Sequence, residues 1–165
     1  MFDTLRMLHV LFGIFFGGTY LFMVPILEPR LKRLGPAVHG PVMQVLMPVM
    51  TPIMATSFII LVGTGVTMTL ILKQGSIGAL LTTGWGWDII VGFLATVVVA
   101  IIGFGMLTPT GIRMDKLGRS IKGRAPSPAE ARQLQQLSHR VDTLSHVNFV
   151  FVVITIISMV VARFL

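Results

Sequence analysis

The chain alternates between four long apolar stretches and three shorter polar ones. Each apolar stretch holds about 20 or more residues, enough for an α-helix to cross a hydrocarbon layer of about 30 Å. The helices are expected at about residues 4–27, 41–73, 85–107 and 128–164. The pattern predicts an all-α fold, an integral membrane four-helix bundle that occupies residues 1–165 as one transmembrane domain.

Two polar segments with prolines at their starts are expected to be loops, at residues 28–40 and 108–127. Pro29 and Pro109 lack the amide hydrogen that an ongoing helix needs, so they are interpreted as helix ends. The sequence Ser127-Pro128-Ala129-Glu130 has serine at a capping position, proline at the first helical position and glutamate at the third. This pattern predicts the start of the fourth helix.

The composition supports a membrane protein. Of the 165 residues, 54% are hydrophobic and 12% are charged, whereas soluble domains average about 25% charged residues. The chain has no cysteine, which excludes disulfides, iron–sulfur clusters and covalently attached c-type haem. Its net charge of +7 is interpreted as a topology signal and as contacts with anionic lipids, with no nucleic-acid partner expected.

The basic residues are distributed unevenly among the polar segments. They concentrate in the first and third segments, as Arg30, Lys32, Arg33, Arg113, Lys116, Arg119, Lys122, Arg124 and Arg132. The second segment has only Lys73 at its edge, and Trp85 and Trp87 follow it. By the positive-inside rule, the first and third loops are cytoplasmic and both termini are outside. We expect a multi-pass protein of a bacterial or archaeal plasma membrane.

A weak internal similarity links the two halves of the chain. The sequence Arg30-Leu-Lys-Arg-Leu-Gly35 is similar to Arg113-Met-Asp-Lys-Leu-Gly118, and each follows the first helix of a predicted hairpin. One hypothesis is therefore a duplication of a helical hairpin. Shared topology signals are the alternative explanation.

His9 is the first candidate for chemistry because a histidine at membrane depth is costly and is often functional. It shares a helix face with Gly13, Gly17 and Tyr20. Glycines beside a histidine leave room for a macrocycle, so this face is a candidate site for haem b. The equal alternative is a helix-packing face on which His9 forms a hydrogen bond to another helix.

The predicted fourth helix carries two more histidines on one face, seven residues apart, His139 and His146. His139 is expected in a polar extension beyond the bilayer, where an ordinary interfacial role is favoured. His146 is equally suited to ligand and structural roles. His9 lies near the outer side and His146 near the inner side, roughly 15 Å apart along the membrane normal. We therefore expect two separate sites, or one site and structural histidines, rather than one shared haem.

A stripe of soft donors follows one side of the predicted second helix. It consists of His39, Met43, Met47, Met50 and Met54. Thioether and imidazole groups suit Cu(I), and His/Met pairs also bind haem iron. The alternative is that methionine fills gaps as an ordinary apolar residue. Met68, further along the same helix, and Asp88 of the predicted third helix lie at a depth similar to that of His9. Either is a candidate second ligand or hydrogen-bond partner.

Short motifs resemble those of known membrane families. The sequence from Leu8 to Gly18, with His9 near its start and Gly17-Gly18 at its end, is similar to the first helix of CopD-type copper-resistance proteins, and Thr64-Gly65 resembles the end of their second helix. The early histidine, the basic first loop and Met47-Pro48-Val49-Met50 resemble HemJ-type protoporphyrinogen oxidases. The resemblance implies a four-helix bundle in which His9 binds haem b or copper.

These observations leave three hypotheses about function. The first is a haem-b protein in electron transfer or redox chemistry, alone, as a homo-oligomer or as a subunit of a larger membrane redox complex. The second is Cu(I) binding or transport through the His/Met stripe. The third is a cofactor-free structural subunit. Phosphate loops, zinc-protease signatures and nucleophile elbows are missing from the sequence, so whether the protein is an enzyme stays open.

Overall fold

A computed structural model describes residues 1–72, 77–121, 123–162 and 164; Lys73, Lys122 and Arg163 therefore lie outside the described residues. The described part is helical apart from short turns and contains no strand. The elements are α1 (Phe2–Phe22), η1 (Met23–Leu27), α2 (Glu28–Arg33), α3 (Pro36–Leu72), η2 (Ile77–Thr82), α4 (Gly84–Ala100), η3 (Ile101–Leu107), α5 (Thr108–Ser120) and α6 (Pro128–Val161).

These elements form four long, continuous helical segments, which we call rods and number in chain order. The first runs through α1, η1 and α2 without a break, and the third runs through α4, η3 and α5, while α3 and α6 are single helices. All four are long and apolar enough to cross a membrane. The predicted all-α four-helix bundle is confirmed, and the four spans support a multi-pass integral membrane protein.

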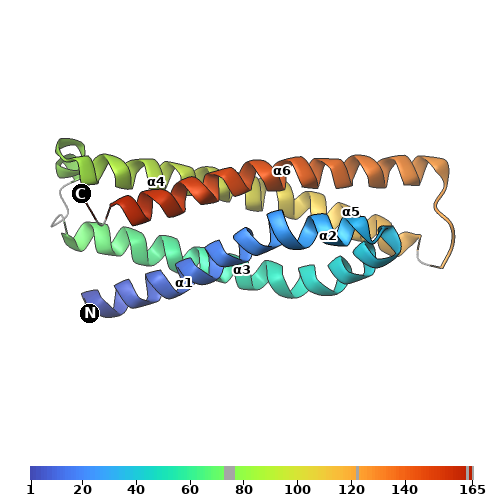
Figure 1. Cartoon of the computed structure of the whole chain (residues 1–165), viewed down its shortest axis with the longest axis horizontal. Coiled ribbons are helices and arrows are strands. Elements are labelled where there is room, and N and C mark those ends of the chain that lie inside the picture. Colours follow the sequence, from blue (N-terminus) through green and yellow to red (C-terminus); the bar gives the residue numbers. More distant parts are fainter. Residues whose placement is uncertain (73–76, 122, 163, 165) are drawn as a thin grey trace.

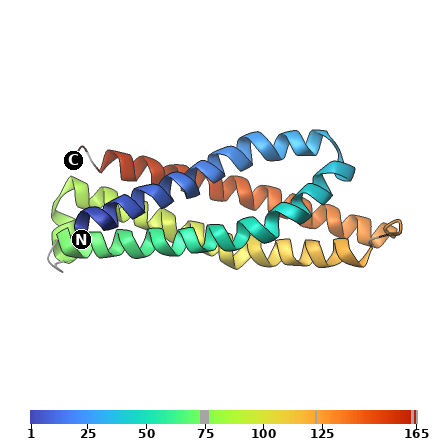
Figure 2. The same ribbon diagram turned by 90° about the horizontal axis from the view of Figure 1, so that it is seen from below.

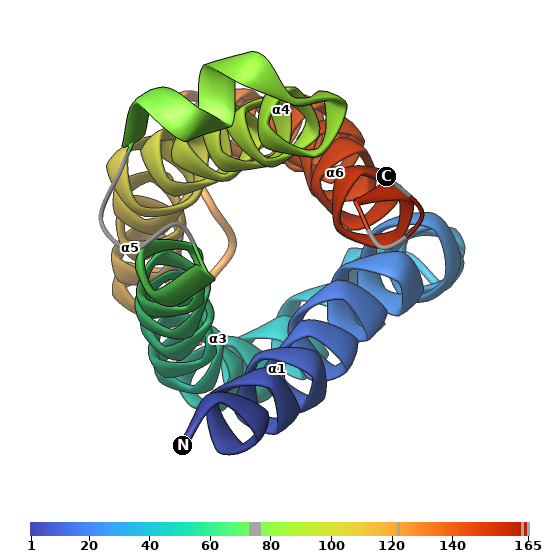
Figure 3. The ribbon, with the colours of Figure 1, turned by 90° about the vertical axis from the view of Figure 1, so that its left-hand side faces the viewer.

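The rods surround the long axis of the molecule as the sides of a square (Figure 3). α1 packs along α3, and α4 packs along α6; α1 also contacts α6, which joins the two hairpins. Both termini and η2 lie at one end of the bundle, whereas the turns that follow α2 and α5 lie at the other end (Figure 1). The predicted basic loops are therefore at the end opposite the termini. We call these two ends of the bundle the basic end and the terminal end.

The predicted loops at residues 28–40 and 108–127 are mostly helical, and this part of the prediction is wrong. α2 and α5 continue the preceding rods, and α3 begins at Pro36 rather than near residue 41. The first connection is reduced to residues 34–35, where Gly35 has a φ of +83°, a left-handed conformation that favours glycine. Pro29 and Pro109 do not end these helices, because each rod continues past its proline without a break.

Two π-helical turns explain how the rods continue past their prolines. η1 contains Pro25, and η3 ends two residues before Pro109. A wider turn relieves the clash of a proline ring with the preceding turn and redistributes the carbonyl acceptors. At η3, the Thr108 hydroxyl donates to the Gly103 carbonyl at 2.9 Å. Both hairpins thus carry a π-helix in their first rod, although their origin by duplication stays a prediction.

α3 contains three internal prolines, Pro41, Pro48 and Pro52, and is still one helix from Pro36 to Leu72. Figure 2 shows its first part bending away from the line of the remainder. Each proline removes one helical hydrogen bond, which is the common cause of such a bend.

The predicted start of α6 is confirmed. The Ser127 hydroxyl accepts a hydrogen bond from the Glu130 amide at 3.3 Å, and the Glu130 carboxylate accepts one from the Ser127 amide at 2.8 Å. At the terminal end of the bundle, the Thr83 hydroxyl caps the start of α4 by accepting a hydrogen bond from the Gly86 amide at 3.1 Å. An added Cβ on Gly86 would lie 1.9 Å from the Leu80 carbonyl oxygen, so only glycine fits there.

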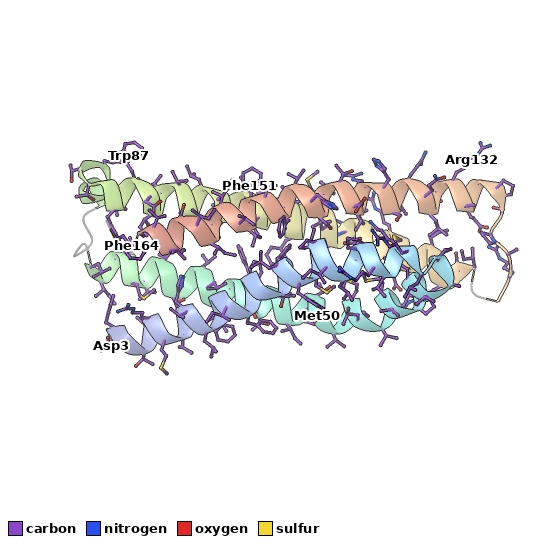
Figure 4. All side chains as sticks on the ribbon, viewed as in Figure 1. Asp3, Met50, Trp87, Arg132, Phe151 and Phe164 are labelled. Atoms are coloured by element: carbon purple, nitrogen blue, oxygen red, sulfur yellow. The ribbon has the colours of Figure 1, made fainter. Side chains whose placement is uncertain are left out.

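Few apolar side chains are buried inside the bundle. Among the described residues, many large apolar side chains face outward, and the apolar side chains that are no more than 9% exposed are Val24, Leu31, Ala95, Val99, Ile102, Val152 and Ala162. An outer surface of this kind is expected where lipid covers the protein. In Figure 4, Asp3, Trp87 and Phe164 lie toward one end, and Arg132 lies at the basic end.

Candidate functional site

His9 of α1 is fixed against α3. Its Nδ1 atom lies 2.9 Å from the Thr64 hydroxyl oxygen and 3.1 Å from the Leu61 carbonyl oxygen. An added Cβ on Gly65 would lie 3.0 Å from Cε1 of His9. Glycine at position 65 therefore lets the imidazole lie close to the backbone of α3. These contacts hold the ring in one orientation at membrane depth.

The hydrogen bonds also determine the tautomer of His9. The Thr64 hydroxyl donates its own hydrogen to the backbone, with the Ile60 carbonyl oxygen at 2.7 Å. The hydroxyl oxygen is then an acceptor for His9, as the Leu61 carbonyl always is. Nδ1 therefore carries the hydrogen, and Nε2 carries the lone pair. No hydrogen-bond partner of Nε2 is present in the part of the chain that the structure describes.

The glycine face predicted around His9 is used for helix packing. An added Cβ on Gly13 would lie 3.6 Å from the Leu61 side chain of α3, and one on Gly17 would lie 2.9 Å from that of Ile156 in α6. Gly17 is buried. Gly17 lets α1 lie close to α6, whereas a Cβ on Gly13 would make only an ordinary van der Waals contact with α3. The two glycines face different helices, so they do not form one flat face for a macrocycle.

An open groove of about 260 Å³ lies about one helical turn inward from His9. It is lined by Phe12 of α1 and by Pro52, Ile53, Thr56 and Ser57 of α3. Cofactor sites usually enclose about 300–1,000 Å³. A macrocycle bound beside this groove would therefore extend partly into lipid rather than lie enclosed in the bundle.

Tyr20, the last member of the predicted face, forms a polar contact with a buried side chain of α6. It is the only tyrosine of the chain, and its hydroxyl lies 2.8 Å from Nδ2 of Asn148, the only asparagine. The Asn148 side chain is completely buried. Sequence reasoning missed this partner, although a lone asparagine in an apolar stretch is itself a signal of a buried polar contact.

A line of aromatic rings extends from Tyr20 across the bundle. The ring centres of Tyr20 and Phe16 are 5.2 Å apart, those of Phe16 and Phe58 are 5.8 Å apart, and those of Phe58 and Phe104 are 5.3 Å apart. With Asn148, these residues come from all four rods. They define a layer at mid-length, which we call the central layer.

His146 and His139 are both exposed, toward the basic end of α6. Nδ1 of His146 lies 2.8 Å from the carbonyl oxygen of Asp142 and 3.4 Å from its carboxylate. That carboxylate also accepts a hydrogen bond from Lys32 of α2 at 2.5 Å, an ion pair that sequence reasoning did not predict. His146 therefore belongs to a polar cluster on the surface.

His9 and His146 are too far apart to hold one metal centre. His9 precedes Tyr20 by 11 residues toward the terminal end, and His146 precedes Asn148 by two residues toward the basic end. With a rise of 1.5 Å per residue, the two histidines are separated by about 19 Å along the bundle. Whether there are two sites, or one site and structural histidines, stays a prediction.

The candidate donor side chains of α3 differ in how exposed they are. Met43, Met50 and Met54 are half-buried, whereas Met47 is 37% exposed. Nε2 of His39, at the head of the stripe, is buried and has no hydrogen-bond partner within the described residues. Met68 is half-buried and follows Thr64 by four residues, so it lies on the helix face that contacts His9, one turn nearer the terminal end.

No group of three histidine, aspartate or glutamate side chains that could hold a metal ion is present among the described residues. In comparisons with known proteins, no family model matches the chain, and neither a curated protein nor a solved structure is significantly similar to it. The resemblance to CopD-type and HemJ-type proteins stays a prediction.

Proposed function

We propose that the protein is a membrane-embedded haem-b protein that handles electrons, with His9 as an axial ligand. One observation supports the proposal: Nδ1 of His9 is hydrogen-bonded to Leu61 and Thr64, and Nε2 keeps a lone pair for which the described residues provide no partner. Histidines that ligate metals usually donate their other ring hydrogen to a carbonyl or similar acceptor, which fixes the tautomer and orients the ring.

The residues around His9 each have a part in this proposal. Thr64 and Leu61 orient the imidazole, and Gly65 lets it lie against α3. A bound haem would supply one-electron chemistry, and the protein would tune it through the axial ligand and the apolar surroundings. Gly13 and Gly17 face α3 and α6, respectively, so the proposed haem contacts are those of His9.

For the second axial position we propose Met68 rather than His146. Met68 lies on the same α3 face as Thr64, one helical turn nearer the terminal end, whereas His146 lies about 19 Å from His9 along the bundle. A His/Met pair raises the reduction potential of haem iron relative to a His/His pair. Met68→Leu is expected to retain haem with an altered spectrum, whereas His9→Leu is expected to lose the haem.

A second candidate function is Cu(I) binding on the His/Met stripe. It is favoured by the buried, unpartnered Nε2 of His39, which lies one turn before the half-buried Met43. Imidazole and thioether are suitable ligands for Cu(I). Met43→Leu with Met50→Leu is expected to abolish stoichiometric copper. Met7→Leu, an exposed methionine of α1, is the matched control.

A pyridine-haemochrome assay and metal analysis of one preparation, expressed with ample haem and copper, distinguish these functions. Haem that depends on His9 and not on the exposed His139 supports the first proposal. Copper that depends on Met43 and Met50, without haem, supports the second. A pure, folded preparation with neither overturns both and leaves the cofactor-free structural subunit.

A further inference from the structure

The positive charges at the basic end outnumber the acidic side chains there. Among the described residues, this end has nine lysines and arginines against four acids, an excess of five positive charges. Each acid is already in an ion pair: Glu28 and Asp142 with Lys32, Asp115 with Arg119, and Glu130 with Arg124. The other six cations are exposed and have no ion pair with a described residue: Arg30, Arg33, Arg113, Lys116, Arg132 and Arg140.

Three of these six cations lie at one level of the bundle, one each on the first, third and fourth rods. They are Arg30, Arg113 and Arg140. The first two follow the central-layer positions Tyr20 and Gly103 by ten residues, and the third precedes Asn148 by eight. With a rise of 1.5 Å per residue, all three lie about 12–15 Å from the central layer. Because α2 and α5 continue their rods, this level is fixed by helices rather than by loops.

The central layer lies close to the midplane expected for the bilayer. Residues 7–27 of the first rod and 89–112 of the third contain no charged side chain. The midpoints of these stretches lie about three residues from Tyr20 and Gly103, toward the terminal end. The three arginines are therefore roughly 16–20 Å from the midplane. The hydrocarbon of a bilayer ends at about 15 Å and its headgroups at about 20–22 Å, so these arginines lie at the depth of the headgroups.

We propose that Arg30, Arg113 and Arg140 bind the phosphate groups of anionic phospholipids in the leaflet at the basic end. We call these three residues the arginine belt. A guanidinium has five N–H donors in a planar fork that matches two oxygens of a phosphate. In Arg30, one of these donors is used by the Ile26 carbonyl oxygen at 3.0 Å, which holds the side chain along the rod and leaves the other four for a lipid.

The charge and the depth of the belt both favour anionic lipid over other partners. A zwitterionic headgroup brings its own cation and leaves the excess of positive charge uncompensated, whereas an anionic headgroup neutralises it. An acidic soluble protein would first meet the cations that project beyond the headgroups. These are Arg33, Lys116 and Arg132, about 20–24 Å from the central layer. The proposal is independent of whether His9 binds haem.

The two sets of three cations give a matched experiment. The full-length protein is reconstituted at 0.15 M salt in phosphatidylcholine bilayers that contain spin-labelled phosphatidylglycerol or spin-labelled phosphatidylcholine. Electron paramagnetic resonance then measures how strongly each labelled lipid associates with the protein. The wild type is expected to prefer phosphatidylglycerol at least about threefold. The combined variant Arg30→Gln, Arg113→Gln and Arg140→Gln is expected to lower this preference at least about twofold.

The control removes the same charge further from the bilayer. The combined variant Arg33→Gln, Lys116→Gln and Arg132→Gln is expected to keep most of the preference, because water and salt separate these positions from the headgroups. Three results would overturn the proposal: no preference in the wild type, an unchanged preference in the belt variant, or an equal or larger loss in the control. The last result would assign the effect to overall charge.

Single variants provide the same comparison if a triple variant does not fold. Arg113 and Lys116 are both exposed and lie three residues apart on α5. Arg113→Gln is expected to lower the preference for phosphatidylglycerol measurably, whereas Lys116→Gln is expected to leave it nearly unchanged. Equal effects, or a larger effect of Lys116→Gln, would contradict a belt at the depth of the headgroups.

Discussion

The phenol of Tyr20 and the amide of Asn148 are hydrogen-bonded at 2.8 Å, although 128 positions separate them in the sequence. Tyr20 belongs to the first rod and Asn148 to the fourth, so this contact joins the two hairpins across their interface. The contact lies next to η1 and η3, where the first and the third rod change from α-helical to π-helical turns.

A double-mutant cycle should detect the coupling of these two residues. Tyr20→Phe leaves Asn148 buried with one partner fewer and is expected to lower the free energy of unfolding by about 1–3 kcal/mol. Asn148→Leu is expected to destabilise as well. The double variant should be less destabilised than the sum of the single ones by about 0.5–2 kcal/mol. Unfolding in mixed micelles measures this, and strict additivity would show that the two side chains act independently.

Two adjacent glycines provide a matched test of the contact between α1 and α6. An added Cβ on Gly17 would lie 2.9 Å from Ile156, whereas one on Gly18 meets nothing within 4 Å. Gly17→Leu is expected to lower the free energy of unfolding by about 1–3 kcal/mol through overpacking. Gly18→Leu is expected to have little effect. Equal effects of the two substitutions would mean that α1 does not pack on α6 through this face.

The capping box of α6 predicts a pH dependence at the basic end. Glu130 lies in the polar extension, outside the membrane-spanning part of α6, and the Arg124 guanidinium, with the Ser127 amide, lowers the pKa of its carboxyl from 4.5 to about 2. Since the folded-state pKa is below the unfolded one, the stabilisation of the helix start is complete above about pH 4.5. It is lost as the pH falls toward 2.

This titration can be followed by NMR of the side-chain carboxyl carbon. In Arg124→Gln, the pKa of Glu130 is expected to rise toward its ordinary value, because the largest cause of the shift is removed. An unchanged pKa of Glu130 in Arg124→Gln would contradict the ion pair at 2.6 Å.

The orientation in the membrane is open to a direct test because the chain has no cysteine. Single cysteines at the exposed positions Gln136 and Asp3 report on the basic end and the terminal end, respectively. By the positive-inside rule, Gln136→Cys is expected to react with a membrane-impermeant reagent only after the inner side is opened. Asp3→Cys should react in intact cells. The reverse pattern would invert the topology.

The four rods could be predicted from the sequence because their apolar length alone determines them. Their ends could not, because Pro29 and Pro109 signal a helix end when only local conformation is considered. In the structure, π-helical turns absorb the prolines, and the helices continue into the polar extensions. The capping sequence at Ser127 was reliable because its hydrogen bonds are local.

The candidate site was predictable only in part, for the same reason. His9 could be singled out because a membrane-depth histidine is unusual. Its partner Thr64 depends on the register between α1 and α3, which no local pattern determines. Gly13 and Gly17 share one helix face by spacing, but the crossing of the helices directs them toward α3 and α6, respectively. Spacing alone therefore suggested a single glycine-lined surface.

The central claim is that Nε2 of His9 is a ligand of haem b. The most direct measurement is the absorption spectrum of the purified protein, in the wild type and in His9→Leu and His139→Leu, expressed with ample haem. The account predicts a Soret band in the wild type and in His139→Leu, and its loss in His9→Leu while the protein stays folded. A folded wild type without a Soret band, or a band that survives in His9→Leu, would contradict it.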